Sequence, residues 1–251
     1  MAEEQKDQPS FRITYYAFQG RAGSLRAAAS LGGVSYEDVF TSGEEHKKAK
    51  EEGTRRWSGV PELVVFDKDG KELITLGQSN ACTRYIGKVT GLYPENAVER
   101  ALVDEILDSV EDVLNVVSPT FGIKDEEKKK AARAKLCEPD KLPYWIGKFE
   151  ARLEENEKRG NKNGYFVGDK ITIADLKAYY GFQFLTSGNL DYIDGAKLME
   201  PAKRCQAFVA KIKENEGMKK MEEAFAASQK EYKENKVKSF KRPGKFVCGS
   251  L

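Results

Sequence analysis

The spacing of hydrophobic and polar positions changes near residue 91. Before that point, short apolar runs separated by turn residues predict strands at 11–18, 34–40, 62–66 and 72–76. A helical run at 25–31 lies between the first two strands and ends at a pair of glycines. The order strand, helix, strand predicts a parallel βαβ unit with a right-handed crossover.

The stretch 59–79, GVPELVVFDKDGKELITLGQS, predicts a hairpin with a distinctive feature at each end. Asp69–Gly70 supplies the positive φ that a tight connection between two strands requires. Pro61 cannot donate to a strand ladder, so it predicts a fixed turn in which the cis peptide form is accessible. Ser79 is predicted as the N-cap of a following helix, whose free N–H groups favour a carboxylate. These two features suit a small, peptide-like ligand that carries a carboxylate.

Beyond residue 97 the apolar spacing becomes helical. Apolar residues recur on one stripe from Val98 to Val117, with acidic residues around it. Thr172 and Asp175 have the spacing of a capping box, so Asp175 is interpreted as structural. Further helices are predicted at 125–159, with an interruption near its prolines, and at 172–187, 200–215 and 217–236.

These patterns predict an α+β protein of two domains. A flexible N-terminus, 1–10, precedes a thioredoxin-like βαβ-ββα domain at 11–90. A linker at 91–97 leads to an all-helical domain at 98–236. The last segment, 237–251, is a basic-aromatic extension without a helical pattern. It is interpreted either as a packed or loose appendage or as a contributor to the substrate site or to a partner contact.

Composition narrows the class of protein. The 251 residues include 42 basic and 40 acidic ones, so the net charge of +2 does not favour nucleic acid or a membrane surface as partner. Four cysteines without a CxxC pair argue against a disulfide scaffold and against a metal site. The polar, acidic start does not resemble a secretory signal, and no apolar run approaches the roughly 20 residues of a membrane span. We therefore expect a soluble, cytoplasmic protein.

Three motifs, in this order, resemble the glutathione S-transferase family. Ile13–Ala22 resembles the first strand and helix start of its sigma-like, tyrosine-type class, to which glutathione-dependent prostaglandin D synthases are related. Val60–Pro61, the hairpin and Gln78–Ser79 resemble the glutathione-binding half. Ile171–Leu176 resembles the capping-box segment of the second domain. The resemblance extends from about Phe11 to about Ala226.

The resemblance implies a homodimeric detoxification transferase that joins glutathione to a small hydrophobic electrophile, with glutathione as co-substrate and no other cofactor. It implies catalytic roles for Tyr15 and Arg21. The residues that it assigns to glutathione binding are Trp57, Val60, Pro61, Gln78, Ser79 and Asp112.

Tyrosine chemistry suits this activity. A free thiol has a pKa near 8.5, so only about 3% is thiolate at pH 7. Lowering that pKa by about two units requires about 2.7 kcal/mol, which one or two hydrogen bonds to the sulfur can supply. Tyr15 stands five residues before Gly20, the placement of the family's catalytic tyrosine, and strand alternation predicts that Tyr16 faces the other side. The alternative is that both tyrosines fill the core.

Other assignments also have simpler alternatives. Arg21 is either a support for the site or a surface arginine. Trp57 either lines the glycyl end of glutathione or is buried. Asp112 either reaches the γ-glutamyl amine in the neighbouring subunit or is a solvated helix-face carboxylate. The basic residue at the glycyl end stays open among Lys47, Lys48, Lys50, Arg55 and Arg56.

Three functions compete. The first is conjugation of glutathione to an electrophile. The second is a glutathione-dependent isomerase or peroxidase, comparable to prostaglandin synthases, which keeps the thiolate step. The third is a non-catalytic structural or binding protein on the same fold. The electrophile pocket is expected around Val110–Phe121 and the C-terminal extension, where the sequence indicates no chemistry. Cys82 is interpreted as a packing residue.

Overall fold

The computed structural model describes residues 9–244, and their contacts form two compact units. One unit contains the described residues up to Tyr93 together with those from Glu214 onward, and the other contains Pro94–Lys213. Most of the segment 1–10 that was predicted to be flexible, and 245–251 of the predicted extension, lie outside the described residues.

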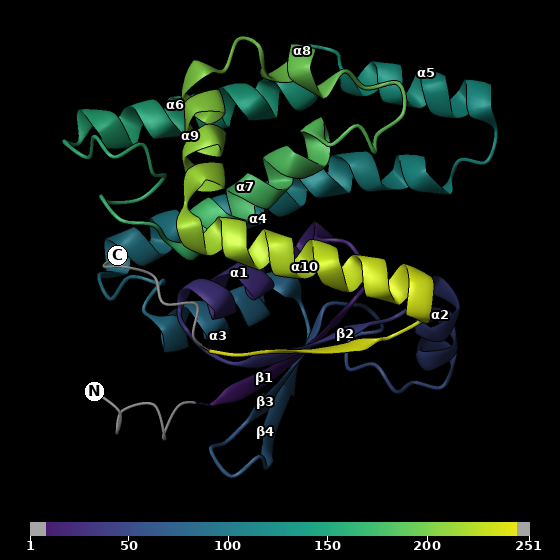
Figure 1. Ribbon diagram of the computed structural model, residues 1–251. Coiled ribbons are helices and arrows are strands. Elements are labelled where there is room, and N and C mark those ends of the chain that lie inside the picture. Colours follow the sequence, from purple (N-terminus) through teal and green to yellow (C-terminus); the bar gives the residue numbers. More distant parts are fainter. Residues whose placement is uncertain (1–8, 245–251) are drawn as a thin grey trace. The chain divides into compact units, whose positions relative to one another are not determined.

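The first unit is built on a five-stranded sheet with the order β4-β3-β1-β2-β5. Its strand β1 pairs in parallel with β2 and antiparallel with β3. The predicted βαβ-ββα order is confirmed (Figure 1), and the two strands of the hairpin begin and end at the predicted residues. Its elements up to the hairpin helix are β1 (Ser10–Tyr15), η2 (Gly20–Ala22), α1 (Gly23–Leu31), β2 (Tyr36–Phe40), α2 (Gly43–Glu51), β3 (Glu62–Phe66), β4 (Glu72–Leu76) and α3 (Ser79–Thr90).

Strand β1 is shorter than the predicted 11–18, because it ends at Tyr15. The backbone carbonyls of Tyr16 and Phe18 accept hydrogen bonds from the guanidinium of Arg26, at 3.3 and 2.9 Å. These carbonyls therefore bind a buried side chain instead of continuing a strand ladder. The segment 16–19 is a loop, and the prediction that Tyr16 belongs to the strand is wrong.

The C-terminal part of the chain belongs to the sheet unit, so the predicted helical domain 98–236 extends too far. Helix α10 (Glu216–Asn235) packs on α1 and buries Phe225, whose ring lies 4.5 Å from the Arg26 guanidinium carbon. After it, β5 (Ser239–Arg242) pairs antiparallel with β2, and Figure 1 shows this strand along the edge of the sheet. The Phe240 ring lies 5.1 Å from that of Phe40. The described part of the extension is therefore packed, and apolar contact with the sheet is the reason.

The second unit is helical, as predicted. Helix α4 packs along α7, and the predicted capping box forms at the start of α7. The Asp175 carboxylate accepts the N–H of Thr172 at 2.7 Å and that of Phe166 at 2.8 Å, so Asp175 is structural. Its elements are α4 (Ala97–Val117), η3 (Ser118–Gly122), α5 (Glu126–Leu136), α6 (Leu142–Lys158), α7 (Ile173–Thr186), α8 (Gly195–Met199) and α9 (Lys203–Glu214).

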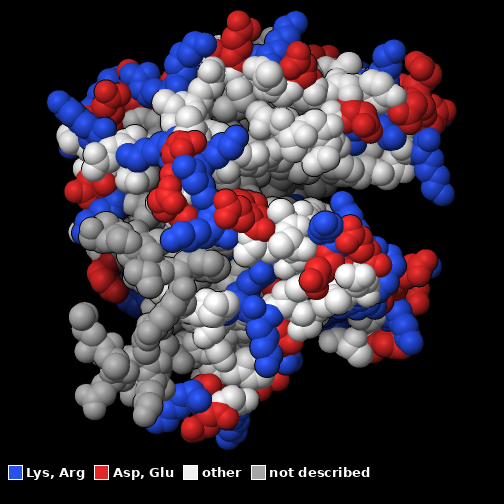
Figure 2. Space-filling model, in the orientation of Figure 1, with Lys and Arg blue, Asp and Glu red and all other residues white. Residues whose placement is uncertain are grey.

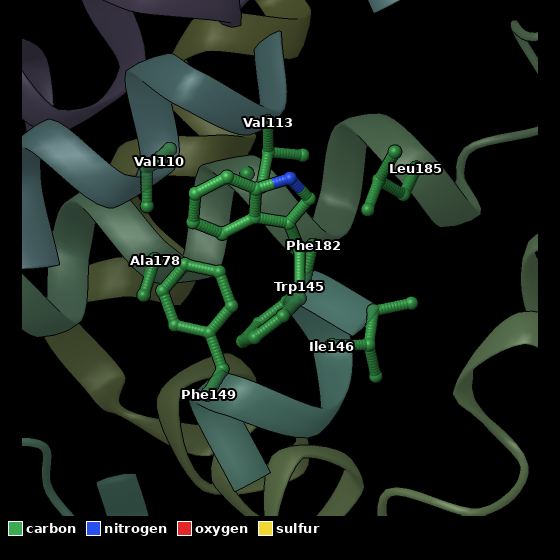
Figure 3. Close-up of a pocket in the computed structure, with 9 residues that line it drawn as sticks. Val110, Val113, Trp145, Ile146, Phe149, Ala178, Phe182 and Leu185 are labelled. Carbon is green, nitrogen blue, oxygen red and sulfur yellow. The ribbon is translucent and has the colours of Figure 1, made fainter. Parts of the chain in front are cut away.

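The interior of this second unit is apolar. Val110 and Val113 of α4 point toward Phe149 of α6 and Phe182 of α7 (Figure 3). These side chains leave a gap of about 10 Å³, which is room for about one water molecule. Val110 and Val113 are buried in the helical unit and line this apolar gap, and a part for the stretch beginning at Val110 in an electrophile pocket stays a prediction.

The surface carries both signs of charge. On the face shown in Figure 2, lysines and arginines are interspersed with aspartates and glutamates. Within residues 9–244, every helix is too short or too polar to cross a membrane.

Candidate active site

Tyr15 is the last residue of β1 and is 5% exposed. Its phenolic oxygen accepts the backbone N–H of Arg21 at 3.3 Å. Gly20 permits this approach, because a Cβ there would lie 2.8 Å from the phenolic oxygen and because its φ is +42°. Burial raises the pKa of Tyr15, while the Arg21 N–H and the charges of Arg21 and Arg26 oppose the rise. The phenol is therefore protonated at neutral pH, and its hydrogen can be donated.

Tyr16 has a different environment, beyond the end of the strand. Its ring is stacked on that of Phe18, with centroids 5.5 Å apart, and meets the His46 ring edge-on at 5.9 Å. The two tyrosine rings lie 5.2 Å apart at 63°. Burial raises the pKa of Tyr16 as well. The Tyr15 hydroxyl lies at the start of η2, the position that the family resemblance implies for the catalytic group.

A buried ion pair supports this loop, and the sequence analysis missed it. The Arg26 Nε donates to both carboxylate oxygens of Asp38 at 3.0 Å, and both side chains are 0% exposed. The same guanidinium holds the loop carbonyls described above. A signal for this pair exists in the sequence, because Asp38 lies between Tyr36 and Phe40 on the buried face of β2.

Helix α10 also holds the loop after β1. Gln229 Nε2 donates to the backbone oxygen of Ala17 at 2.6 Å. Gln19 Nε2 donates to Glu222 of the same helix at 3.1 Å. The loop beside Tyr15 is thus fixed by α1 on one side and by the C-terminal helix on the other. No sequence pattern identified α10 as a neighbour of this loop.

The hairpin places the predicted clamp next to the strand that carries Tyr15. The Val60–Pro61 peptide is cis, the form that the sequence allowed for. The β1–β3 register ends with Glu62 opposite Thr14, so the backbone groups of Val60 lie outside the ladder. The structure therefore leaves the Val60 backbone free of the sheet, beside the end of β1.

Trp57 is 62% exposed, so the interpretation that it is buried is wrong. Its ring covers Gly77, where a Cβ would lie 2.5 Å from Trp57 Cδ1. Only a glycine leaves room for the ring there. This contact brings Trp57 next to Gln78, which follows Gly77 at the end of β4.

The helix start after the hairpin differs by one residue from the prediction. Gln78, with φ 69°, is the N-cap, and Ser79 is the first residue of α3 rather than its cap. Gln78 adopts the non-helical backbone conformation that a cap requires, which moves the boundary by one position. A positive φ at a residue other than glycine is uncommon and is found more often at functional sites. The first N–H groups of the twelve-residue helix α3 remain suited to a carboxylate.

Among the five basic residues considered for the glycyl end, Arg55 bonds to the clamp strand through its side chain, and the backbone N–H of Arg56 donates to the same Glu62 at 3.3 Å. The NH1 group of Arg55 donates to Glu62 at 3.2 Å, and the Arg55 side chain is 15% exposed. Lys47 and Lys48 instead pair with glutamates of their own helix, and their side chains are 78% and 75% exposed. Within the described chain, Arg55 Nε and His46 Nδ1 are buried without a hydrogen-bond partner. His46 was not predicted as a site residue.

Arg21 and Asp112, two further predicted site residues, have different environments. Arg21 contributes its backbone N–H to Tyr15, and its side chain is half-buried. Asp112 is exposed on α4 in the helical unit, next to Glu111, which pairs with the buried Lys177. A role for Asp112 across a subunit boundary stays a prediction.

The fold and the Tyr15 site define a class: a thioredoxin-like sheet unit joined to a helical unit. Residues 111–225 match the family described as "Glutathione S-transferase, C-terminal domain". "Glutathione S-transferase 4" of Caenorhabditis elegans is 30% identical over 199 residues, which is 76% of this chain and 88% of that protein. "Hematopoietic prostaglandin D synthase" of Gallus gallus is 31% identical over 168 residues, 67% of this chain and 75% of that protein.

A solved structure agrees with these sequence relatives. Prostaglandin synthase D of Nilaparvata lugens superposes with a TM-score of 0.70 at 25% identity, covering 85% of this chain and 97% of that one. The chain belongs to the glutathione S-transferase family. Glutathione is the co-substrate in this family.

Proposed function

We propose that this protein is a glutathione transferase in which the hydroxyl of Tyr15 stabilises the thiolate of glutathione. The observation that carries the proposal is the hydrogen bond from the Arg21 N–H to the Tyr15 oxygen. It occupies an acceptor site of that oxygen and leaves the phenolic hydrogen available to a ligand. The bond also withdraws charge from the oxygen, which makes the O–H a better donor.

The reaction follows from this geometry. The thiol of bound glutathione releases its proton to solvent, and the Tyr15 O–H donates a hydrogen bond to the resulting sulfur anion. The thiolate then forms a carbon–sulfur bond with the electrophile. The electrons of the broken bond leave with the leaving group or, in an addition, move onto the acceptor and are protonated. Tyr15 stays protonated throughout, because burial holds its pKa above its ordinary value.

Glutathione binding is assigned to the surface beside Tyr15. The Val60 backbone, outside the ladder, would pair with the cysteinyl part, and Pro61 fixes its direction. Gln78 and Ser79, at the N-terminus of α3, would bind the γ-glutamyl carboxylate. Trp57 and Arg55 would then face the glycyl end, where an arginine is suited to a carboxylate.

The hydrophobic electrophile would lie against aromatic side chains. Phe18 is 49% exposed and stacks on Tyr16, and its ring lies 5.4 Å from that of Tyr15. An exposed aromatic ring beside the thiol-activating hydroxyl offers apolar area to the second substrate.

A homodimer is part of the proposal, with Asp112 reaching the γ-glutamyl amine bound to the partner. Leu73 and Ile74, on the edge strand β4, are 59% and 42% exposed. Exposed apolar side chains on an edge strand are typical of surfaces that a partner covers.

The relatives named for prostaglandin synthesis favour a second candidate, in which the same thiolate adds to a substrate and is released again. Product analysis separates the two functions, because conjugation consumes glutathione and isomerisation regenerates it. A non-catalytic relative would retain neither reaction.

The deciding experiment combines calorimetric titration with glutathione and a conjugation assay with chlorodinitrobenzene and other electrophiles. We expect glutathione to bind and to be consumed. Binding without consumption, but with conversion of a peroxide or prostaglandin precursor, supports the second candidate. If glutathione does not bind, both enzymatic functions are wrong.

A further inference from the structure

Lys238 joins two elements of the sheet unit. Its backbone oxygen accepts the N–H of Phe40, the last residue of β2, at 2.7 Å. Its ammonium group pairs with the carboxylate of Glu45 in α2. The residue that leads into β5 is therefore bound to the sheet through its main chain and to α2 through its side chain.

Helix α2 depends on contacts of this kind. None of its residues, GEEHKKAKE, is buried. A helix with little buried apolar area gains little stability from packing, so its ends decide its position. At its start, the Ser42 hydroxyl accepts the N–H of Glu45 at 3.1 Å, and the Glu45 carboxylate accepts the N–H of Ser42 at 2.8 Å. Glu45 thus takes part both in the capping box of α2 and in the ion pair with Lys238 of the C-terminal extension.

The position of α2 bears on the candidate site. The ring of His46, next to Glu45, meets the ring of Tyr16, and Tyr16 follows Tyr15. The chain after α2 carries Arg55 and leads to the Val60 clamp, and Arg55 is bonded to β3 through Glu62. A shift at the start of α2 would therefore move the contact with Tyr16 on the one hand and the segment that carries Arg55 and Val60 on the other.

We infer that the C-terminal strand β5, through Lys238, holds α2 in place and thereby sets the affinity for glutathione. Lys238 is then a positioning residue that does not touch the substrate. The effect on glutathione affinity rests on the proposed function. The effect on the position of α2 rests only on the contacts that Lys238 makes with Phe40 and Glu45. Strand β5 also packs Phe240 on Phe40, which fixes the strand without help from the ion pair.

The test compares three variants of the full chain. Glu45→Gln keeps a residue that supports a capping box but removes the charge that Lys238 binds. Lys238→Met removes the ammonium group and keeps an unbranched apolar side chain. Lys241→Met is the matched control, because it removes an exposed lysine of β5 that lies opposite Glu37 rather than beside α2. Two readouts are needed: hydrogen exchange of the amides of 43–51, and the separate kinetic constants for glutathione.

We expect Glu45→Gln and Lys238→Met to speed amide exchange in α2 by about two- to fivefold, the range that an exposed ion pair supports. The KM for glutathione should rise by a similar factor while kcat stays unchanged, and Lys241→Met should behave as the unaltered protein. Unchanged exchange in both variants overturns the inference, even if glutathione is turned over normally. Faster exchange with an unchanged KM overturns the link to glutathione affinity. If the unaltered protein does not bind glutathione, the proposed function fails, and the exchange data still decide whether Lys238 positions α2.

Discussion

The phenolic oxygen of Tyr15 and the backbone N–H of Arg21 lie 3.3 Å apart and are hydrogen-bonded. The contact joins the end of a strand to the start of a helix, and Gly20 makes the approach sterically accessible. The group that polarises the hydroxyl is the backbone N–H of Arg21, and a substitution of the Arg21 side chain does not remove it. Loss of the Arg21 side chain should therefore affect catalysis less than loss of the Tyr15 hydroxyl.

Tyr15→Phe should lower kcat/KM for conjugation by about 10- to 100-fold, because a hydrogen bond to a charged group contributes about 1.5–3 kcal/mol. The pH–rate profile should move to higher pH by about one to two units, since the sulfur anion loses its donor. Steady-state kinetics between pH 6 and pH 9 measure both effects. Tyr16→Phe is the control and should leave the profile in place. The assignment is wrong if the two variants behave alike.

Arg26→Met should destabilise the protein by about 3–5 kcal/mol, because it leaves the Asp38 carboxylate buried without its partner. Urea unfolding at pH 7 measures the loss. The double variant Arg26→Met/Asp38→Leu removes the uncompensated charge and should recover much of the lost stability. If the double variant is no more stable than the single one, the loss comes from the loop carbonyls that Arg26 also binds.

The stability contributed by Asp175 should depend on pH. Burial raises the pKa of its carboxyl to about 6 from an ordinary 3.8, in spite of the N–H groups that it accepts. Because the folded-state pKa is the higher one, this contribution is fully present below about pH 4 and is lost as pH rises through 6. The stability difference between the unaltered protein and Asp175→Asn should thus be larger at pH 4.5 than at pH 7.5, by on the order of 2 kcal/mol. Guanidinium unfolding at both pH values measures it, and a difference independent of pH contradicts the raised pKa.

The two tryptophans allow glutathione binding to be located. Trp57 is exposed beside Gln78, whereas Trp145 lines the apolar gap in the helical unit. Glutathione should change the fluorescence of the protein through Trp57, because a ligand there removes water from an exposed indole. Titration of Trp145→Phe should retain the change, and titration of Trp57→Phe should lose it. The reverse result would place glutathione away from the hairpin.

Several features were predictable because short segments specify them. The bounds of β3 and β4 follow from a run of apolar residues, an Asp-Gly turn and a second run. The capping box at Thr172 follows from a spacing of three residues. In both cases the residues that decide the structure are neighbours in the chain.

The site was predictable only in part. Tyr15 was singled out through a family resemblance and the hairpin through its own apolar runs and turn, but the N-cap at Gln78 depends on a backbone conformation that the sequence does not indicate. The Arg26–Asp38 pair could have been suspected from a carboxylate on the buried face of β2, yet its partner was not recognisable. Sequence position also placed α10 in the helical domain, whereas its apolar face covers the sheet unit.

The sequence by itself determined most of the helices and strands, since periodicity, turns and caps act over a few residues. Only the tertiary structure decided that the last strand completes the sheet, where Ser239 bonds to Glu37 across 202 positions. This contact requires the edge of β2, with which β5 pairs antiparallel. Its two partners are far apart in the sequence and are brought together only by the fold, so no local sequence pattern predicts it.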